Sequence, residues 1–210
     1  MLMAFWIRIR DKLQAVLVKL VNIIYERYMR IRLQNKDFTI LCSNCMGGII
    51  YHRLGLQFRS PTVNLWMRQR DFLKLAMKPR EYMDEKLVFI ESEYSYPVAQ
   101  LGDIKIYFNH SKDEETARKD WERRKKRINY DNLFLIMFDR ENLSDKEILI
   151  LEDAPCKGKI VLSPMERKEI PFVKTIVPKN RPMGKQYHDK DWFGLRTFEK
   201  HFDFVRWLNQ

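Results

Sequence analysis

The chain has 210 residues, which is enough for one sizeable hydrophobic core and a small appendage. Hydrophobic residues make up 45% of it and aromatic residues 13%, which excludes a disordered chain, and the formal net charge of +11 favours an anionic partner: nucleic acid, anionic lipid or an acidic substrate. An odd number of cysteines (Cys42, Cys45 and Cys156) argues against a disulfide framework and fits a reducing compartment.

The N-terminal segment predicts one long amphipathic helix over about residues 4–33. Apolar side chains recur at three- and four-residue spacing from Trp6 to Ile31, and mostly basic side chains occupy the opposite face. Lys19 and Asn22 interrupt the longest apolar run, so it is too short and too charged to span a bilayer, and a signal-peptide pattern is absent. We expect this helix to lie on a membrane surface or against membrane-bound assembly proteins. Packing on its own domain is the alternative.

Short apolar runs alternate with helical patterns after residue 36, where charged and polar residues end the first helix. Strands are predicted at residues 38–42, 87–90, 104–108, 132–138, 159–162 and 172–177. Helices are predicted from residue 45, at 71–77, 111–128 and 192–208, and residues 96–102 are expected to form a connector. The predicted fold is α/β, with a mainly parallel sheet and helices on both faces. Residues 1–36 are expected to be the amphipathic helix and residues 37–210 a single domain.

Three chemically active residues follow predicted strand ends, where α/β proteins place functional groups. Cys45 opens a predicted helix, whose N-terminus favours a thiolate. His110 can act as its base, and Asp139 or, second, Asp103 can orient the imidazole as in a catalytic triad. The structural alternative is a buried cysteine and a hydrogen-bonding histidine.

Several neighbours of these residues are candidates for substrate binding. Asn44 or Asn109 can donate to a developing oxyanion. Gly47 and Gly48 lie in the first turns of the predicted helix, where close packing or an approaching ligand would explain them. The segment 59–64 can bind an anion through Arg59, Ser60, Thr62 and Asn64, although an ordinary turn is the alternative.

Other chemistries find weaker support. Cys42 and Cys45 form a C-x-x-C pair, but a metal site needs two more ligands, so no metal and no cofactor are expected. The basic run Arg123–Arg127 is not part of a recognised nucleic-acid module, so no nucleic-acid partner is expected. Walker and G-x-G-x-x-G loops are absent, and the absence of D-x-D weakens a metal-dependent glycosyltransferase interpretation.

Five motifs resemble a bacterial exopolysaccharide or capsule biosynthesis family that carries a domain of unknown function. They are Ser43-Asn-Cys-Met-Gly-Gly48, Leu54-Gly-Leu-Gln-Phe-Arg-Ser-Pro-Thr62, Tyr96-Pro-Val98, Leu101-Gly-Asp-Ile104 and Trp121-Glu-Arg-Arg-Lys-Lys-Arg-Ile-Asn129, within residues 38–165. A fainter similarity runs to papain-like cysteine peptidases, with Cys45, His110 and the helix of Arg123 and Arg124 in the corresponding places.

The resemblance implies a role in capsule or exopolysaccharide production without implying a reaction. We expect a polysaccharide-modifying acyltransferase, with an acyl donor and a sugar or lipid-linked saccharide as substrates. A glycosyltransferase or sugar-nucleotide transferase using His110 or Asp103 is the second hypothesis, and a non-enzymatic assembly factor is the third. The expected location is cytoplasmic and peripheral, at the inner face of the cell membrane.

Overall fold

A computed structural model of the chain describes residues 2–176 and 190–210. Its centre is a four-stranded parallel sheet in the order β1-β5-β6-β7. The strands are β1 (Thr39–Cys42), β5 (Leu133–Phe138), β6 (Gly158–Ser163) and β7 (Val173–Thr175). Because β1 and β5 are parallel, with Cys42 opposite Ile136, their carboxyl ends meet at one edge of the sheet. The predicted end of the last strand, residue 177, lies outside the described residues.

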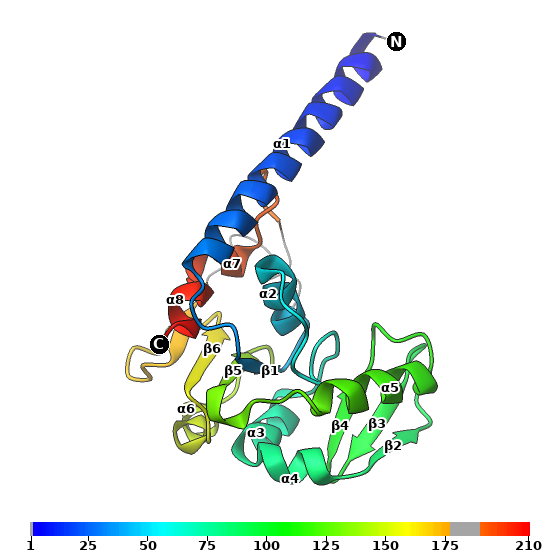
Figure 1. The fold of residues 1–210 in the computed structure, drawn as a ribbon, viewed down its shortest axis with the longest axis vertical. Helices are drawn as coiled ribbons and strands as arrows, with labels where there is room; N and C mark the ends of the chain where they lie inside the picture. The colour runs from blue at the N-terminus through cyan, green and yellow to red at the C-terminus, as the bar shows by residue number, and fades with distance from the viewer. Residues whose placement is uncertain (1, 177–189) are drawn as a thin grey trace.

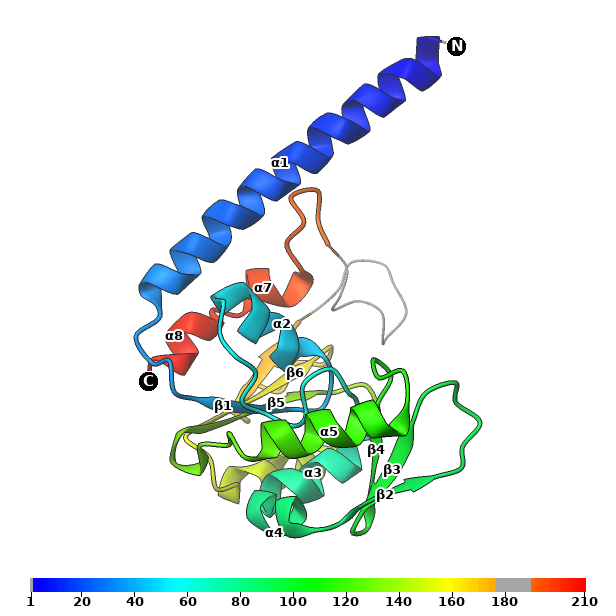
Figure 2. The ribbon, with the colours of Figure 1, turned by 45° about the vertical axis from the view of Figure 1, so that its right-hand side comes forward.

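Helices cover both faces of this sheet (Figures 1 and 2). On one face Leu41 and Leu135 pack with α3 (Gln69–Met77), α5 (Glu114–Lys125) and α6 (Asp145–Leu149). On the other face Ile40 and Ile136 pack with α2 (Met46–Leu54), α7 (Thr197–His201) and α8 (Phe204–Leu208). Burial on both faces explains the nearly continuous apolar sequence of the strands. The predicted α/β class is confirmed.

A second, antiparallel sheet lies beside the first, and its last strand leads to His110. It consists of β2 (Leu87–Ile90), β3 (Val98–Leu101) and β4 (Ile104–Tyr107), in that order. The predicted connector at 96–102 is therefore wrong, because most of it is β3. The two-residue turn Gly102-Asp103, with Gly102 at a φ of 57°, closes a hairpin between β3 and β4.

The predicted C-terminal helix is divided in two. The chain breaks between α7 and α8 at Phe202 and Asp203, and the Asp203 side chain accepts from the backbone N–H of Arg206 to cap α8. Helix α5 also begins later than the predicted residue 111, because its N-cap is Asp113. Besides these, the described residues form α4 (Pro79–Asp84) and two short 3₁₀ helices, Tyr130–Asn132 and Ile150–Asp153.

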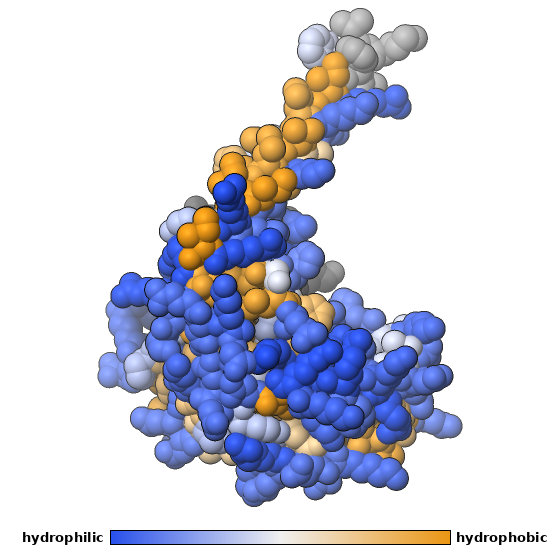
Figure 3. Space-filling model, viewed as in Figure 1, coloured by the Kyte–Doolittle hydropathy of each residue, from blue (hydrophilic) through white to orange (hydrophobic). Residues whose placement is uncertain are grey.

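The predicted N-terminal helix is α1 (Leu2–Arg32), whose N-terminal half projects from the body (Figure 1). Its C-terminal half packs on α2 and α8 and buries Met29. A buried ion pair joins the helices, because Arg53 of α2 contacts Glu199 of α7 at 2.7 Å and Glu26 of α1 at 3.1 Å. Along the projecting half, apolar side chains remain on the surface (Figure 3). Within the described residues, no helix combines the length and the apolar character that a bilayer span requires.

Helix α2 ends at Gly55, which adopts a left-handed conformation with a φ of 67°. A Cβ atom placed there would also lie 3.1 Å from the Arg30 guanidinium of α1. We expect Gly55→Ala to lower the free energy of unfolding by about 1–2 kcal/mol, because residues with a Cβ are strained in this region. Urea unfolding measures it. Gln57→Ala, at an exposed position in the following loop, is the control, and an equal effect of both changes would contradict the explanation.

Candidate active site

Cys45 is fixed between the end of β1 and the start of α2. Its carbonyl accepts the first hydrogen bond of α2, from the N–H of Ile49 at 3.2 Å. Two hydrogen bonds of Ser43 hold the preceding turn against β5: Ser43 N–H donates to the carbonyl of Ile136, and Ser43 Oγ accepts from Phe138 N–H. The Asn44 side chain accepts from Met46 N–H at 2.9 Å and so caps the helix. The thiol therefore lies at a helix N-terminus, as expected.

His110 reaches the same place from the antiparallel sheet. It follows β4 by three residues, and the preceding Tyr107 forms an isolated backbone bridge with Trp66. The two rings stack with their centroids 3.8 Å apart. The next residue, Met67, donates its N–H to the carbonyl of Ser43 at 3.2 Å. The loop of Trp66 and Met67 therefore connects the turn before Cys45 to the end of β4. It brings Cys45 and His110, which are 65 residues apart in the chain, into contact.

The Cys45 Sγ and His110 Nε2 atoms lie 3.1 Å apart. That is within reach for a nucleophile and its base. Cys45 is half-buried and His110 is exposed, so the pair is at the surface of the molecule. Burial raises the pKa of the Cys45 thiol, against the opposing effects of the Asn109 side chain and the Arg140 charge. Because its pKa is raised, the thiol is mainly protonated near neutral pH and needs a base to become a nucleophile.

Of the two predicted asparagines, Asn109 contacts the Cys45 thiol, whereas the Asn44 side chain contacts the Cys42 thiol and Met46 N–H. The Asn109 side chain donates a hydrogen bond to Cys45, which lowers the pKa of the thiol and so opposes the effect of burial. The amide oxygen of Asn109 and the amide nitrogen of Asn44 are buried and have no hydrogen-bond partner among the described residues. An amide donor beside the reacting sulfur is the kind of group that stabilises an oxyanion.

A cation near the thiol was missed in the sequence. Arg140 is exposed at the carboxyl end of β5, the strand next to β1, and its charge lowers the pKa of both Cys42 and Cys45. Gln69 fixes the backbone beside it, because its side chain donates to the carbonyl of Phe138 and accepts from Glu141 N–H. The signal was available: Arg140 directly follows Asp139, which was itself selected for its place after a strand.

Asp139 does not orient His110, and this prediction is wrong. The carboxylate is completely buried and accepts from Arg167 Nη1 and Ser163 Oγ, both at 3.0 Å, and from Leu143 N–H at 3.1 Å. These bonds join the ends of β5 and β6 and use the carboxylate for structure. The strand-end position was correct, but a buried carboxylate needs a cation, and Arg167 supplies it.

Asp103 does not contact His110 either. It lies in the turn before β4, whereas His110 follows the other end of that strand. Its carboxylate binds Lys74 at 2.6 Å and the Tyr82 hydroxyl at 2.5 Å, and these two partners lower the pKa of Asp103. In the described part of the chain, no hydrogen bond joins a carboxylate to His110. The geometry is therefore a thiol–imidazole pair and not a triad.

The predicted anion site at residues 59–64 is a structural element. Arg59 forms an ion pair with Asp37, which precedes β1 and so lies at the opposite edge of the sheet from Cys45. Ser60 and Thr62 are completely buried and bonded to each other at 3.0 Å, and Thr62 Oγ1 accepts from Cys42 N–H at 2.9 Å. These contacts fix β1 in place and leave Arg59 away from the thiol.

Close packing explains the two glycines after Cys45. A Cβ on Gly48 would lie 2.5 Å from the Asn64 side-chain oxygen and 3.1 Å from Val63, and a Cβ on Gly47 would lie 3.2 Å from the Cβ of Cys42. Asn64 has a φ of 60° and packs against α2 here. Gly47, Gly48 and Asn64 therefore hold α2 against the sheet, and the expected ligand contact has no support from these distances.

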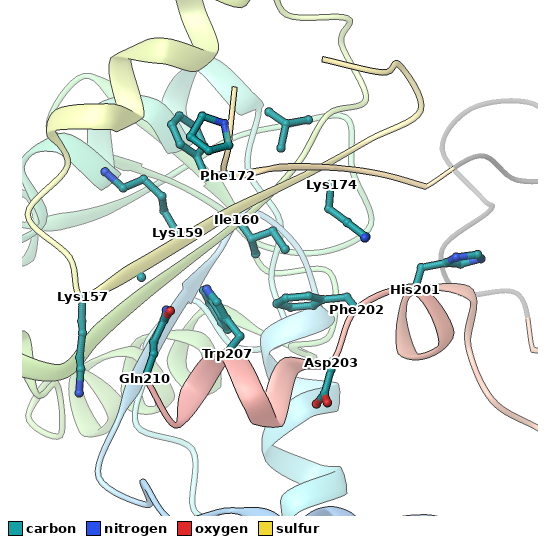
Figure 4. A pocket seen from close by; sticks show the side chains of 13 residues that line it. Lys157, Lys159, Ile160, Phe172, Lys174, His201, Phe202, Asp203, Trp207 and Gln210 are labelled. Atoms are coloured by element: carbon teal, nitrogen blue, oxygen red, sulfur yellow. The ribbon is translucent and has the colours of Figure 1, made fainter. Parts of the chain in front are cut away.

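A hollow of about 520 Å³ lies elsewhere, between β6, β7 and α8. Figure 4 shows the rings of Phe172, Phe202 and Trp207 around it, with Lys159 and Lys174 at its sides. It borders the start of β6, whereas Cys45 and His110 lie beyond the carboxyl end of β1. The hollow is therefore not part of this site.

The three thiols differ in their surroundings, which predicts their reactivity. Cys42 is buried, its thiol donates to Asn44 at 3.2 Å, and burial raises its pKa to about 12. Burial also raises the pKa of Cys156, and among the described residues no histidine contacts its thiol. We expect iodoacetamide to label Cys45 first in the folded protein, and the rate to rise with pH as the thiolate fraction grows. Peptide mapping measures this, and faster labelling of Cys42 would contradict it.

The fold and the site together define an α/β protein with a thiol–imidazole pair at the carboxyl edge of its parallel sheet. A family model described as "Domain of unknown function (DUF1919)" matches residues 17–209. The chain belongs to this family. The matched residues include half of α1 and the C-terminal helices, and the family's description names no capsule or peptidase function. An uncharacterized protein of Haemophilus influenzae is 31% identical over 204 residues, which cover 95% of this chain and 97% of the relative.

Proposed function

We propose that the protein is an acyltransferase that forms a thioester on Cys45. The observation that carries this proposal is the 3.1 Å contact between the Cys45 sulfur and His110 Nε2 at an accessible helix N-terminus. A protonated thiol beside an imidazole is the arrangement that general-base activation requires. Asn109, which donates to the same sulfur, supplies an amide at the reacting centre.

The reaction would proceed in two balanced steps. His110 Nε2 takes the proton of the Cys45 thiol while the sulfur attacks the acyl carbonyl carbon, and the bond from that carbon to the leaving group breaks. The proton passes from His110 to the leaving group. An acceptor hydroxyl then attacks the thioester and gives its proton to His110, and the Cys45 sulfur leaves and is reprotonated. Arg140 provides a positive charge near the thiol for an anionic group of the donor.

The acceptor in this proposal is a saccharide of bacterial surface-polysaccharide synthesis. Support for it comes from the resemblance of the segments 43–48, 54–62 and 121–129 to capsule and exopolysaccharide proteins. A lipid-linked saccharide would be met at the inner face of the cell membrane, in the cytoplasm. The sugar-transfer alternative relied on Asp103 or His110, and Asp103 is occupied by Lys74 and Tyr82.

An activated acyl ester tests the proposal. Wild-type protein should release the leaving group in a rapid burst of one equivalent, followed by slower turnover that polysaccharide oligosaccharides accelerate. Cys45→Ala should remove the burst, and Cys156→Ala, at another half-buried thiol, should retain it. A burst that survives Cys45→Ala would refute the covalent mechanism. Binding of a sugar nucleotide in calorimetry, together with the absence of a burst in the wild-type protein, would favour sugar transfer.

A further inference from the structure

Helix α1 has two apolar faces, and the protein covers one of them. Met29 and Leu33 are buried against the domain, and Tyr25 packs on the same core. Nearer the N-terminus, a Cβ placed on Gly194 would lie 2.7 Å from the Val18 side chain, so these two residues are close together. Asn22 donates to the carbonyl of Phe193. These residues lie on one side of the helix, which is therefore the side turned to the body.

The second apolar face points away from the body and is exposed along the helix. It consists of Trp6, Leu13, Leu17, Leu20, Ile24 and Ile31, whose exposed fractions range from 41% to 75%. With about 100° between successive residues, these six fall within a sector of about 60°, whose centre lies about 150° from the centre of the packed face. We call this row the outer stripe. Figure 3 shows apolar side chains following the projecting helix in this way.

The charges on the projecting half of α1 are almost all positive. Between residues 6 and 20 there are four cations, Arg8, Arg10, Lys12 and Lys19, and a single acid, Asp11. Asp11 is itself paired with Arg10 at 2.8 Å. The helical angles place Arg10 about 20° from one edge of the outer stripe and Arg27 about 20° from the other, whereas Arg8, Lys12 and Lys19 form a second row about 80° from the stripe. An apolar stripe flanked by cations matches the boundary between acyl chains and anionic headgroups.

Two arginines distinguish a bilayer from a second copy of the chain as the occupant. The outer stripe follows the spacing of a coiled-coil seam, but Arg10 and Arg27 occupy two positions of that seam. In a helix pair their charges would be buried. At a bilayer surface, both lie at the edges of the stripe and can extend their guanidinium groups into the headgroup layer. The sequence therefore fits a lipid surface better.

We propose that α1 lies in the surface of an anionic bilayer, with the outer stripe in the apolar layer and the domain on the aqueous side. The inference is independent of the chemistry at Cys45, because no residue of the site is involved. It gives the protein a peripheral membrane contact that does not cross the bilayer.

The test is co-sedimentation of the full chain with vesicles of phosphatidylcholine and phosphatidylglycerol. We expect binding that weakens at high salt and is much weaker with phosphatidylcholine alone. The double variant Leu13→Glu and Leu20→Glu should reduce the partition coefficient at least about tenfold, because it puts two charges into the apolar layer. Leu149→Glu with Ile150→Glu is the matched control, since both residues are exposed and apolar on the domain.

Circular dichroism and the Cys45 labelling rate verify that each variant is folded. Absence of wild-type binding to the anionic vesicles would overturn the proposal, and so would equal losses in the two double variants. Sedimentation velocity gives the remaining decision. A dimer that Leu13→Glu and Leu20→Glu dissociate, combined with no vesicle binding, would assign the outer stripe to a second copy.

Discussion

His110→Ala should reduce the rate of Cys45 acylation by an activated ester by about 10²- to 10⁴-fold, the usual contribution of a general base. The physical reason is the raised pKa of the Cys45 thiol, which leaves little thiolate near neutral pH unless the imidazole removes the proton. Stopped-flow release of the leaving group measures the rate. In the variant the rate should keep rising with pH, because only direct ionisation of the thiol remains.

His52→Ala is the matched control for this experiment. His52 is also an exposed histidine, on helix α2 itself, and no contact joins it to the Cys45 sulfur. Its removal should leave the acylation rate within about twofold, which is far below a general-base effect. If His110→Ala and His52→Ala give the same acylation rate, the contact between Cys45 and His110 has no catalytic role.

Asp139→Ala should lower the free energy of unfolding by about 3 kcal/mol, because it leaves the Arg167 guanidinium buried without its buried counter-ion. We place the value at the lower end of the range for broken buried pairs, since Asp145 still contacts Arg167 at 2.7 Å. Urea unfolding measures the loss. Asp103→Ala is the control, and its exposed carboxylate should change the unfolding midpoint little.

The same variant separates a structural role from a catalytic one. At a temperature where Asp139→Ala is folded, Cys45 acylation should remain within about threefold of wild type, whereas loss of a triad carboxylate costs about 10⁴-fold. A large kinetic defect in a fully folded variant would show that Asp139 acts on His110 through groups not in contact with it here. Unchanged stability would contradict the role of the Arg167 pair.

Local pattern was sufficient to predict the parallel sheet and the place of Cys45. The strands at 39–42 and 133–138 are buried on both faces, and that burial requires the continuous apolar runs from which they were predicted. The antiparallel sheet was harder. The segment 98–101 is too short to show an alternation of apolar and polar residues, and it forms a strand because it pairs with β4. The division between α7 and α8 depends likewise on a single cap, Asp203.

Position along the chain was sufficient to predict the site residues that follow strand ends. It was not sufficient to predict roles that depend on tertiary contacts. Cys45 and His110 were selected because each follows a strand end, and the bridge between Trp66 and Tyr107 brings them together. The same rule selected Asp139 and overlooked Arg140 next to it. No sequence pattern indicates that Arg167, 28 residues from Asp139, binds the Asp139 carboxylate, because that pairing depends on the register of β5 and β6.

The most direct test of covalent acyl transfer is to map the modified residue after a short reaction. Wild-type protein is mixed with an activated acyl ester, quenched in acid and digested, and the peptides are identified by mass spectrometry. The proposed mechanism predicts one acyl group on Cys45, formed within the burst, lost when an acceptor saccharide is added, and nearly absent in His110→Ala. Acylation confined to lysines, or a Cys45 that stays unmodified while the leaving group is released, would contradict the mechanism.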